Sequence, residues 1–95
     1  MTPPMQLQWT SHALEDLERL YEFLEPVNPR AAARAVQALV ASPARLLKHP
    51  RIGEQLDEFE PREVRRILVG PYEIRYEIQG STIFVLRLWH AREDR

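Results

Sequence analysis

The chain has 95 residues, with 13 basic and 14 acidic side chains and no cysteine. Because so short a chain cannot build two hydrophobic cores, residues 1–95 are expected to form a single domain. The lack of cysteine excludes disulfides and thiolate metal sites and favours a reducing, cytoplasmic location, and no apolar run approaches the length of a membrane span. The formal net charge of −1 argues against a general nucleic-acid coat protein.

The first half of the chain predicts one short strand followed by two helices. Residues 5–9 alternate apolar and polar side chains, as a half-buried strand does. Thr10 or Ser11 offers an N-cap for the first helix, which a proline stops. The second helix is rich in alanine, begins at Asn28 and is expected either to kink near Ser42 or to begin afresh there. The apolar stripe of the first helix comprises Leu14, Leu17, Tyr21 and Leu24, widened by Leu20 and Phe23.

The second half predicts a loop over residues 51–62 and then three strands, at residues 63–69, 72–78 and 82–89. The last of these is apolar on both faces, so it belongs in the middle of a sheet, with the first strand of the chain beside it. The expected fold is therefore α+β, in the order β-α-α-β-β-β, with a helical hairpin packed on one face of a four-stranded, mainly antiparallel sheet of strand order 1-4-3-2. In the last strand one face carries Ile83, Val85 and Trp89, and the other carries Phe84, Leu86 and Leu88.

Arginine supplies nearly all of the basic side chains, since Lys48 is the only lysine. Planar guanidinium groups suit bidentate contact with phosphate or carboxylate, and a GC-rich genome is the alternative explanation for their excess. The arginines of the C-terminal part follow directly on an acidic segment. They are Arg62, Arg65, Arg66, Arg75, Arg87 and Arg92, and the acidic residues are Glu54, Asp57, Glu58, Glu60 and Glu63.

Three of these arginines have predictable surroundings. Arg65 and Arg66 point to opposite faces of their strand, so one of them lies on the helix-covered side or at its rim. An arginine in that place needs a carboxylate partner. Arg75 alternates with two glutamates along its strand, which predicts a solvated cross-strand salt bridge. The first helix offers Glu15, Glu18 and Glu22 as partners for the inward arginine.

The end of the last strand places a histidine among cations. His90 lies between Arg87 and Arg92, and histidine is the side chain best able to exchange protons near neutral pH. It is either a strand-end residue that bonds to the backbone or a functional group. Arg87 either stacks on the Trp89 ring or forms the floor of an anion-binding groove. The sequence has no glycine-rich phosphate loop, no HExxH and no metal-spaced histidine cluster, so we expect no metal and no cofactor.

The chain resembles the RelE/ParE toxin superfamily of type II toxin–antitoxin modules over essentially its whole length, and most clearly in its C-terminal half. The resemblance rests on the run Arg65–Tyr76, on Gly80 and on the run Val85–Arg92, and the length and the alanine-rich second helix also fit. It implies a small cytoplasmic toxin that a cognate antitoxin holds inactive. RelE-like and YoeB-like members cut messenger RNA on the ribosome, whereas ParE-like members inhibit DNA gyrase.

The resemblance also indicates which of the two branches of the superfamily, ribonucleases or gyrase inhibitors, the chain fits. For a ribonuclease it implies His90, Arg92 and Arg66 as catalytic residues. The middle-strand position after Tyr72, where the ribonucleases carry arginine, is Glu73 here, and a carboxylate repels a phosphate. The low net charge is likewise unfavourable for ribosome binding. We therefore expect a ParE-like inhibitor of DNA gyrase, with ribosome-dependent cleavage of messenger RNA as the alternative.

The expected partners are a protein antitoxin and the toxin's target. A disordered antitoxin tail is expected to fold into the groove between hairpin and sheet, where its acids meet basic side chains. No membrane binding and no sequence-specific DNA binding are expected of this chain. The expected antitoxin contacts are Arg65, Arg66, Arg75 and Arg87, and the expected target contacts are Arg87, Trp89, His90 and Arg92.

Overall fold

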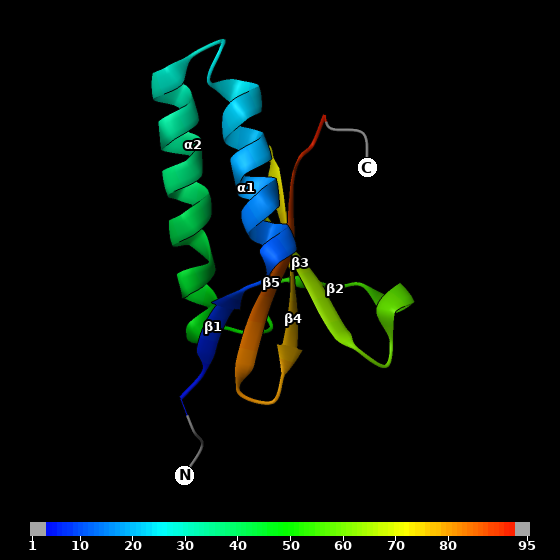
Figure 1. Cartoon of the computed structure of the whole chain (residues 1–95). Coiled ribbons are helices and arrows are strands. Elements are labelled where there is room, and N and C mark those ends of the chain that lie inside the picture. The colour runs from blue at the N-terminus through cyan, green and yellow to red at the C-terminus, as the bar shows by residue number, and fades with distance from the viewer. Residues whose placement is uncertain (1–3, 93–95) are drawn as a thin grey trace.

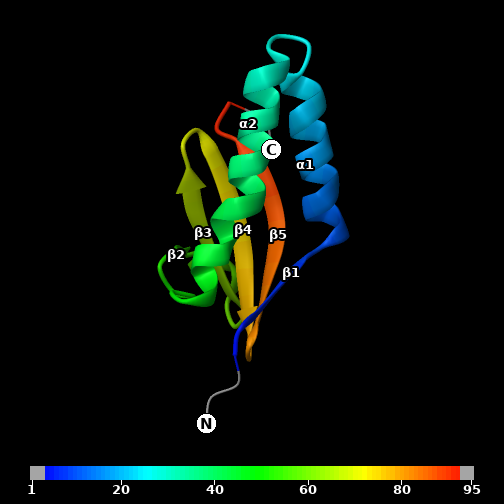
Figure 2. The ribbon, with the colours of Figure 1, turned by 90° about the vertical axis from the view of Figure 1, so that its left-hand side faces the viewer.

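The computed structural model describes residues 4–92 as two layers, a helical hairpin and a mixed five-stranded sheet (Figure 1). The hairpin lies against one face of the sheet and its tip extends past the sheet's end (Figure 2). This arrangement confirms the predicted α+β architecture. The elements in chain order are β1 (Gln6–Trp9), α1 (Ser11–Leu24), α2 (Pro29–Ala41), the 3₁₀ helix η1 (Ser42–Leu47), β2 (Glu54–Gln55), the 3₁₀ turn η2 (Asp57–Phe59), β3 (Glu63–Val69), β4 (Tyr72–Gln79) and β5 (Thr82–His90).

Both helices begin where the sequence provides an N-cap. The Thr10 hydroxyl accepts a hydrogen bond from the Ala13 N–H at 3.1 Å, and the side chain of Asn28 caps α2 in the same way. The predicted interruption at Ser42 is a change of helix type, because α2 passes directly into η1 at this residue. The Ser42 hydroxyl donates to the Ala38 carbonyl at 2.7 Å.

The inward face of α1 differs from the predicted stripe. Leu14 and Tyr21 are 53% and 41% exposed, while Ala13, Asp16 and Leu20 are buried. The reason is that α1 runs beside the edge of β5, where Thr10 hydrogen-bonds the β5 backbone. Leu17 and Leu20 of the predicted stripe do contact the core, whereas Phe23 is exposed like Leu14 and Tyr21.

The sheet has the order β1-β5-β4-β3-β2, with β1 parallel to β5 and the other pairs antiparallel. The predicted order 1-4-3-2 is confirmed, with one strand added. Within the segment 51–62, predicted as a loop, Glu54 pairs with Arg66 and Gln55 with Arg65. A strand of two residues is too short to show a period in the sequence, so the pattern did not reveal β2.

A bulge in β5 corrects the predicted faces of that strand. Tyr76 pairs with Val85 but Arg75 pairs with Arg87, so Leu86 has no partner residue on β4. One extra residue moves every later side chain to the opposite face. Leu88 therefore joins the core on the helix side, while Trp89 lies on the other face, opposite to the prediction.

Candidate functional site

Three arginines lie side by side on the sheet face that points away from the helices. Arg66 of β3 pairs with Arg75 of β4, which pairs with Arg87 of β5. Ile74, next to Arg75 in β4, belongs to the core that the helices cover, so the three arginines occupy the opposite face. We call these residues the arginine row. Like charges at adjacent positions repel each other, and carboxylates are therefore required among them.

A buried glutamate joins two members of the arginine row. One oxygen of Glu73 accepts from Arg66 Nη1 at 3.3 Å, and the other accepts from Arg75 Nη2 at 3.4 Å. The Glu73 side chain is only 4% exposed. Arg66 is also bound by Glu54 of β2, at 3.0 Å from Nε. Burial of this carboxylate is tolerable because guanidinium groups meet both of its oxygens.

Arg75 lies between two aromatic rings. Its guanidinium carbon is 4.5 Å from the centre of the Trp89 ring and 5.2 Å from that of the Phe59 ring. Its Nε is buried and has no hydrogen-bond partner among residues 4–92. The predicted salt bridge is present, but it joins Arg75 to Glu73 of the same strand and is not cross-strand or solvated. The bulge turns Trp89 onto this face and η2 brings Phe59 over it.

Arg87 is held at the edge of the sheet by Asp16 of α1. Its Nε and Nη2 donate to the two Asp16 oxygens at 2.7 and 3.1 Å. Asp16 also accepts from the Leu88 N–H at 2.9 Å and forms an ion pair with Arg19, which donates to the Leu88 carbonyl at 3.2 Å. Side chains of α1 thereby satisfy the backbone hydrogen-bonding groups of β5 at Leu88, beyond the point where β1 ends. Of the two predicted settings for Arg87, the stacked one is present, with 5.3 Å to the centre of the Trp89 ring.

Hydrogen bonds from arginine lower the pKa values of the carboxyl groups that they contact. Burial by itself raises the pKa of Asp16, but hydrogen bonds from Arg87, the Leu88 N–H and Arg19 outweigh it and hold the pKa below its ordinary value. Hydrogen bonding from Arg62, at 2.6 and 3.2 Å, lowers the pKa of Glu77. Both residues are therefore ionised in the folded protein at neutral pH.

This arrangement predicts a loss of stability in acid. A carboxyl whose pKa is lower in the folded state than in the unfolded state contributes stability above the unfolded pKa and loses it as the pH falls through the folded pKa. For Asp16 and Glu77 the ordinary values are 3.8 and 4.5. We expect the urea midpoint to be nearly constant from about pH 7 to pH 5 and to fall steeply between about pH 4 and pH 2. A midpoint that rises on acidification would contradict this assignment.

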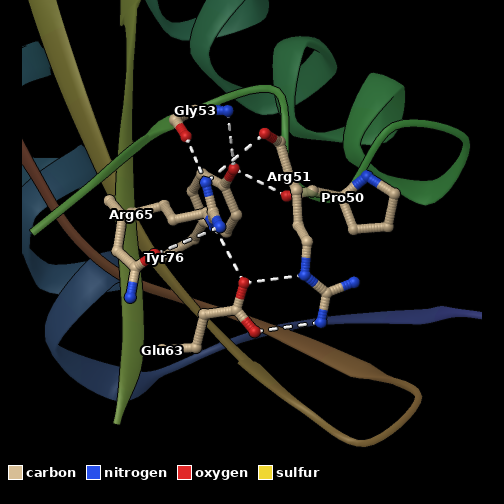
Figure 3. Close-up of polar contacts among 7 residues, drawn as sticks. Pro50, Arg51, Gly53, Glu63, Arg65 and Tyr76 are labelled. Atoms are coloured by element: carbon tan, nitrogen blue, oxygen red, sulfur yellow. Dashed lines mark hydrogen bonds and ion pairs between the residues drawn. The ribbon is translucent and has the colours of Figure 1, made fainter. Parts of the chain in front are cut away.

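Arg65 lies on the helix side of the sheet and is the inward arginine of the pair predicted from the sequence. Its Nε donates to Glu63 at 2.9 Å and its Nη1 donates to the Gly53 carbonyl at 2.8 Å (Figure 3). Glu63 also binds Arg51, at 2.8 and 3.0 Å. The expected partners in α1 are wrong, because the strand itself supplies the carboxylate two residues away on the same face.

The predicted ribonuclease residues lie on two faces of the sheet. His90 is on the helix side, where its ring contacts the Tyr72 ring edge-on at 5.1 Å, and its Nδ1 accepts from the Arg92 N–H at 3.0 Å. Arg66 belongs to the opposite face. Arg92 is exposed just past β5. Among the predicted target contacts, Arg87 and Trp89 therefore lie together, while His90 faces the other way.

Two residues important to this face were missed by sequence reasoning. In the sequence Asp16 is one of several acids that favour the start of a helix, although its spacing from Ala13 and Leu20 matches the buried face. Phe59 lies in a segment without periodicity, and no local signal places its ring on Arg75. Within residues 4–92 no group of three acidic or histidine side chains is placed to hold a metal ion, and no helix there is long and apolar enough to cross a membrane.

Solved structures place the fold among bacterial and archaeal toxins of toxin–antitoxin complexes. A chain of the chromosomal ParDE system of P. aeruginosa matches with a TM-score of 0.77 at 27% identity, covering 92% of this chain and 96% of that one. A chain of the RelBE2 complex of Mycobacterium tuberculosis matches with a TM-score of 0.61 at 26% identity, covering 95% and 93%. The RelE–RelB complex of Pyrococcus horikoshii shares the fold, with a TM-score of 0.68 at 14% identity over 97% of this chain and 100% of that one.

Sequence comparisons identify the family. Residues 7–95 match the model of the ParE toxin of the type II toxin–antitoxin system parDE. Two toxins of Caulobacter vibrioides are also similar: Toxin RelE1 is 38% identical over 87% of this chain and 89% of its own length, and Toxin RelE2 is 31% identical over 90% and 94%. The chain belongs to the ParE toxin family, within the ParE/RelE superfamily, and is the toxin of a type II toxin–antitoxin system.

Proposed function

We propose that this toxin inhibits DNA gyrase and is neutralised by a cognate antitoxin. The observation that carries the proposal is Glu73, a buried carboxylate at the centre of the arginine row. Cleavage of RNA by a metal-free enzyme needs positive charge on the phosphate that develops in the transition state. Here Glu73 takes Arg66 and Arg75 as partners and so offsets the positive charge that a phosphate would need at that place. The face therefore suits protein recognition better than phosphate chemistry.

The alternative function is ribosome-dependent cleavage of messenger RNA. It draws support from the two Caulobacter relatives that are named RelE and from the neighbouring positions of His90 and Arg92. Against it stands the separation of His90 from Arg66 by the thickness of the sheet, since a general acid and a phosphate clamp must act on one scissile bond.

An antitoxin partner is supported by the toxin–antitoxin complexes among the structural neighbours and by exposed apolar side chains of the hairpin. Leu14, Tyr21 and Val40 are 53%, 41% and 48% exposed on the two helices. An amphipathic antitoxin segment that covers them would bury this area. Its acids would find Arg87, which is bonded to Asp16 of α1 and keeps 41% of its side chain exposed, whereas Arg66 lies on the other face of the sheet. The site of action would be the cytoplasm.

The direct test is supercoiling of relaxed plasmid by purified gyrase in the presence of the toxin. We expect micromolar toxin to block supercoiling and an equimolar amount of the cognate antitoxin to restore it. Primer extension on messenger RNA from induced cells should show no codon-specific cuts. Normal supercoiling together with cuts that His90→Ala and Arg92→Ala abolish would establish the ribonuclease instead.

A further inference from the structure

The charges of the helical hairpin are segregated in spite of the net charge of −1. Residues 26–53, which include α2 and η1, contain five arginine and lysine residues and no aspartate or glutamate. Residues 11–25, which include α1, contain five acidic residues and one arginine. One helix of the hairpin is thus strongly basic and the other strongly acidic. This separation of charge will orient the toxin in the electrostatic field of a charged partner.

Four of the five cations are exposed along α2, η1 and the residue that follows η1, and we call these four residues the basic ridge. Arg30 and Arg34 are one helical turn apart in α2, and Arg45 follows in the 3₁₀ helix η1, where it also lines a pocket with Gly53 and Glu54. The buried residues Ala32 and Leu39 face the interior, on the opposite side of α2. The ridge residues Arg30, Arg34, Arg45 and Lys48 are all exposed and have no ion pair with any of residues 4–92.

The part of α2 that carries Arg30 and Arg34 has only small or polar side chains on the same side of the helix. The exposed positions between Arg34 and Arg45 on this side are alanine and glutamine, and α2 is the outer helix of the hairpin (Figure 1). Protein partners gain most of their binding energy from aromatic or aliphatic anchors, and this side of α2 offers no large apolar side chain for them to contact. A polyanion needs no anchor, because release of its condensed counterions supplies the affinity. The positions concerned are Gln37, Ala38 and Ala41.

We propose that the basic ridge binds the phosphate backbone of double-stranded DNA. Guanidinium groups bind phosphate bidentately, and the four ridge cations are not engaged elsewhere in the described chain, unlike the arginine row. A convex helix carrying cations along its length can follow a duplex groove, and the acidic α1 keeps the other side of the hairpin away from DNA. The inference deepens the proposed function, on which it rests, because gyrase holds DNA and a toxin bound to gyrase would meet it.

The test measures binding of the full-length toxin to a fluorescent duplex of about 20 base pairs, without gyrase, by anisotropy at increasing salt. Because four cations are involved, we expect log K to fall with log salt with a slope of about −3 to −4. Arg30→Gln/Arg34→Gln should weaken binding at low salt about tenfold and reduce the slope by about 2. Glutamine has nearly the helix propensity of arginine, so circular dichroism should be unchanged.

The control is Gln37→Ala, which changes the same helix surface without removing charge and should bind like the wild type. Three results would overturn the proposal: no saturable binding up to about 100 µM toxin at low salt, equal binding by the double variant, or tighter binding to duplex RNA or to polyglutamate of equal charge than to DNA. Since gyrase is absent from the titration, its outcome does not depend on whether the toxin inhibits gyrase.

Discussion

Replacing Asp16 with alanine is expected to lower the free energy of unfolding by about 2–3 kcal/mol. The change removes the acceptor of the buried Leu88 N–H at the β5 edge and leaves Arg87 without its carboxylate. Water will compensate part of the loss, because Arg87 and Arg19 keep 41% and 43% of their side chains exposed. Urea unfolding at neutral pH, followed by circular dichroism, measures the difference.

A matched control for this variant lies on the same helix. Glu18 is exposed and the structure gives it no ion pair with residues 4–92, so Glu18→Ala should change stability by less than about 0.5 kcal/mol. Asp16→Asn keeps the size of the side chain and one oxygen acceptor, so its loss of unfolding free energy should lie between those of Asp16→Ala and Glu18→Ala. If Asp16→Ala proved as stable as Glu18→Ala, the pairing of α1 with β5 through Asp16 would be wrong.

Gly53→Ala is expected to cost about 3 kcal/mol, because the structure leaves no room for a methyl group there. A Cβ at this position would lie 2.6 Å from the Arg66 carbonyl oxygen and 2.6 Å from the Tyr76 hydroxyl. The segment would have to move away from the sheet. That would break the bond from the Gly53 N–H to Tyr76 Oη, 3.0 Å, and the bond from Arg65 to the Gly53 carbonyl, 2.8 Å (Figure 3).

Thermal unfolding of Gly53→Ala should be compared with that of Gly70→Ala. Gly70 has a φ of +57°, but a Cβ added there would meet nothing within 4 Å, so alanine incurs backbone strain alone, about 1–2 kcal/mol. Gly53→Ala should therefore melt at a lower temperature than Gly70→Ala. Equal melting temperatures would show that the loop before β2 adapts freely and that the contact with Tyr76 is not tight.

Much of the fold follows from local patterns. The alternation in residues 72–78 and the caps Thr10 and Asn28 predict β4 and both helices, and the strand at 82–89 that is apolar on both faces is correctly predicted to lie inside the sheet, beside the first strand. The bulge at Leu86 could not be predicted, because apart from Arg87 the residues around it are apolar and allow the strand to be placed in either register. That single residue determines which face Trp89 occupies.

The candidate site is harder to predict than the fold. The sequence shows a surplus of arginine but not the partners, because Asp16 and Arg87 are 71 residues apart and only the tertiary structure joins them. The sequence shows that Glu73 occupies the position where the resembling ribonucleases carry arginine, and the structure adds that its carboxylate is buried between Arg66 and Arg75. The unpaired cations of α2 carry no signal of their own, since arginine is an ordinary helix surface residue.

The topology of a plasmid in cells that express the toxin tests the central claim most directly. If the toxin inhibits gyrase, plasmid from induced cells should lose negative supercoils as growth stops, and co-expression of the antitoxin should preserve both supercoiling and growth. If growth stops while plasmid supercoiling stays unchanged, gyrase is not the target and the assignment to the gyrase-inhibiting branch is contradicted.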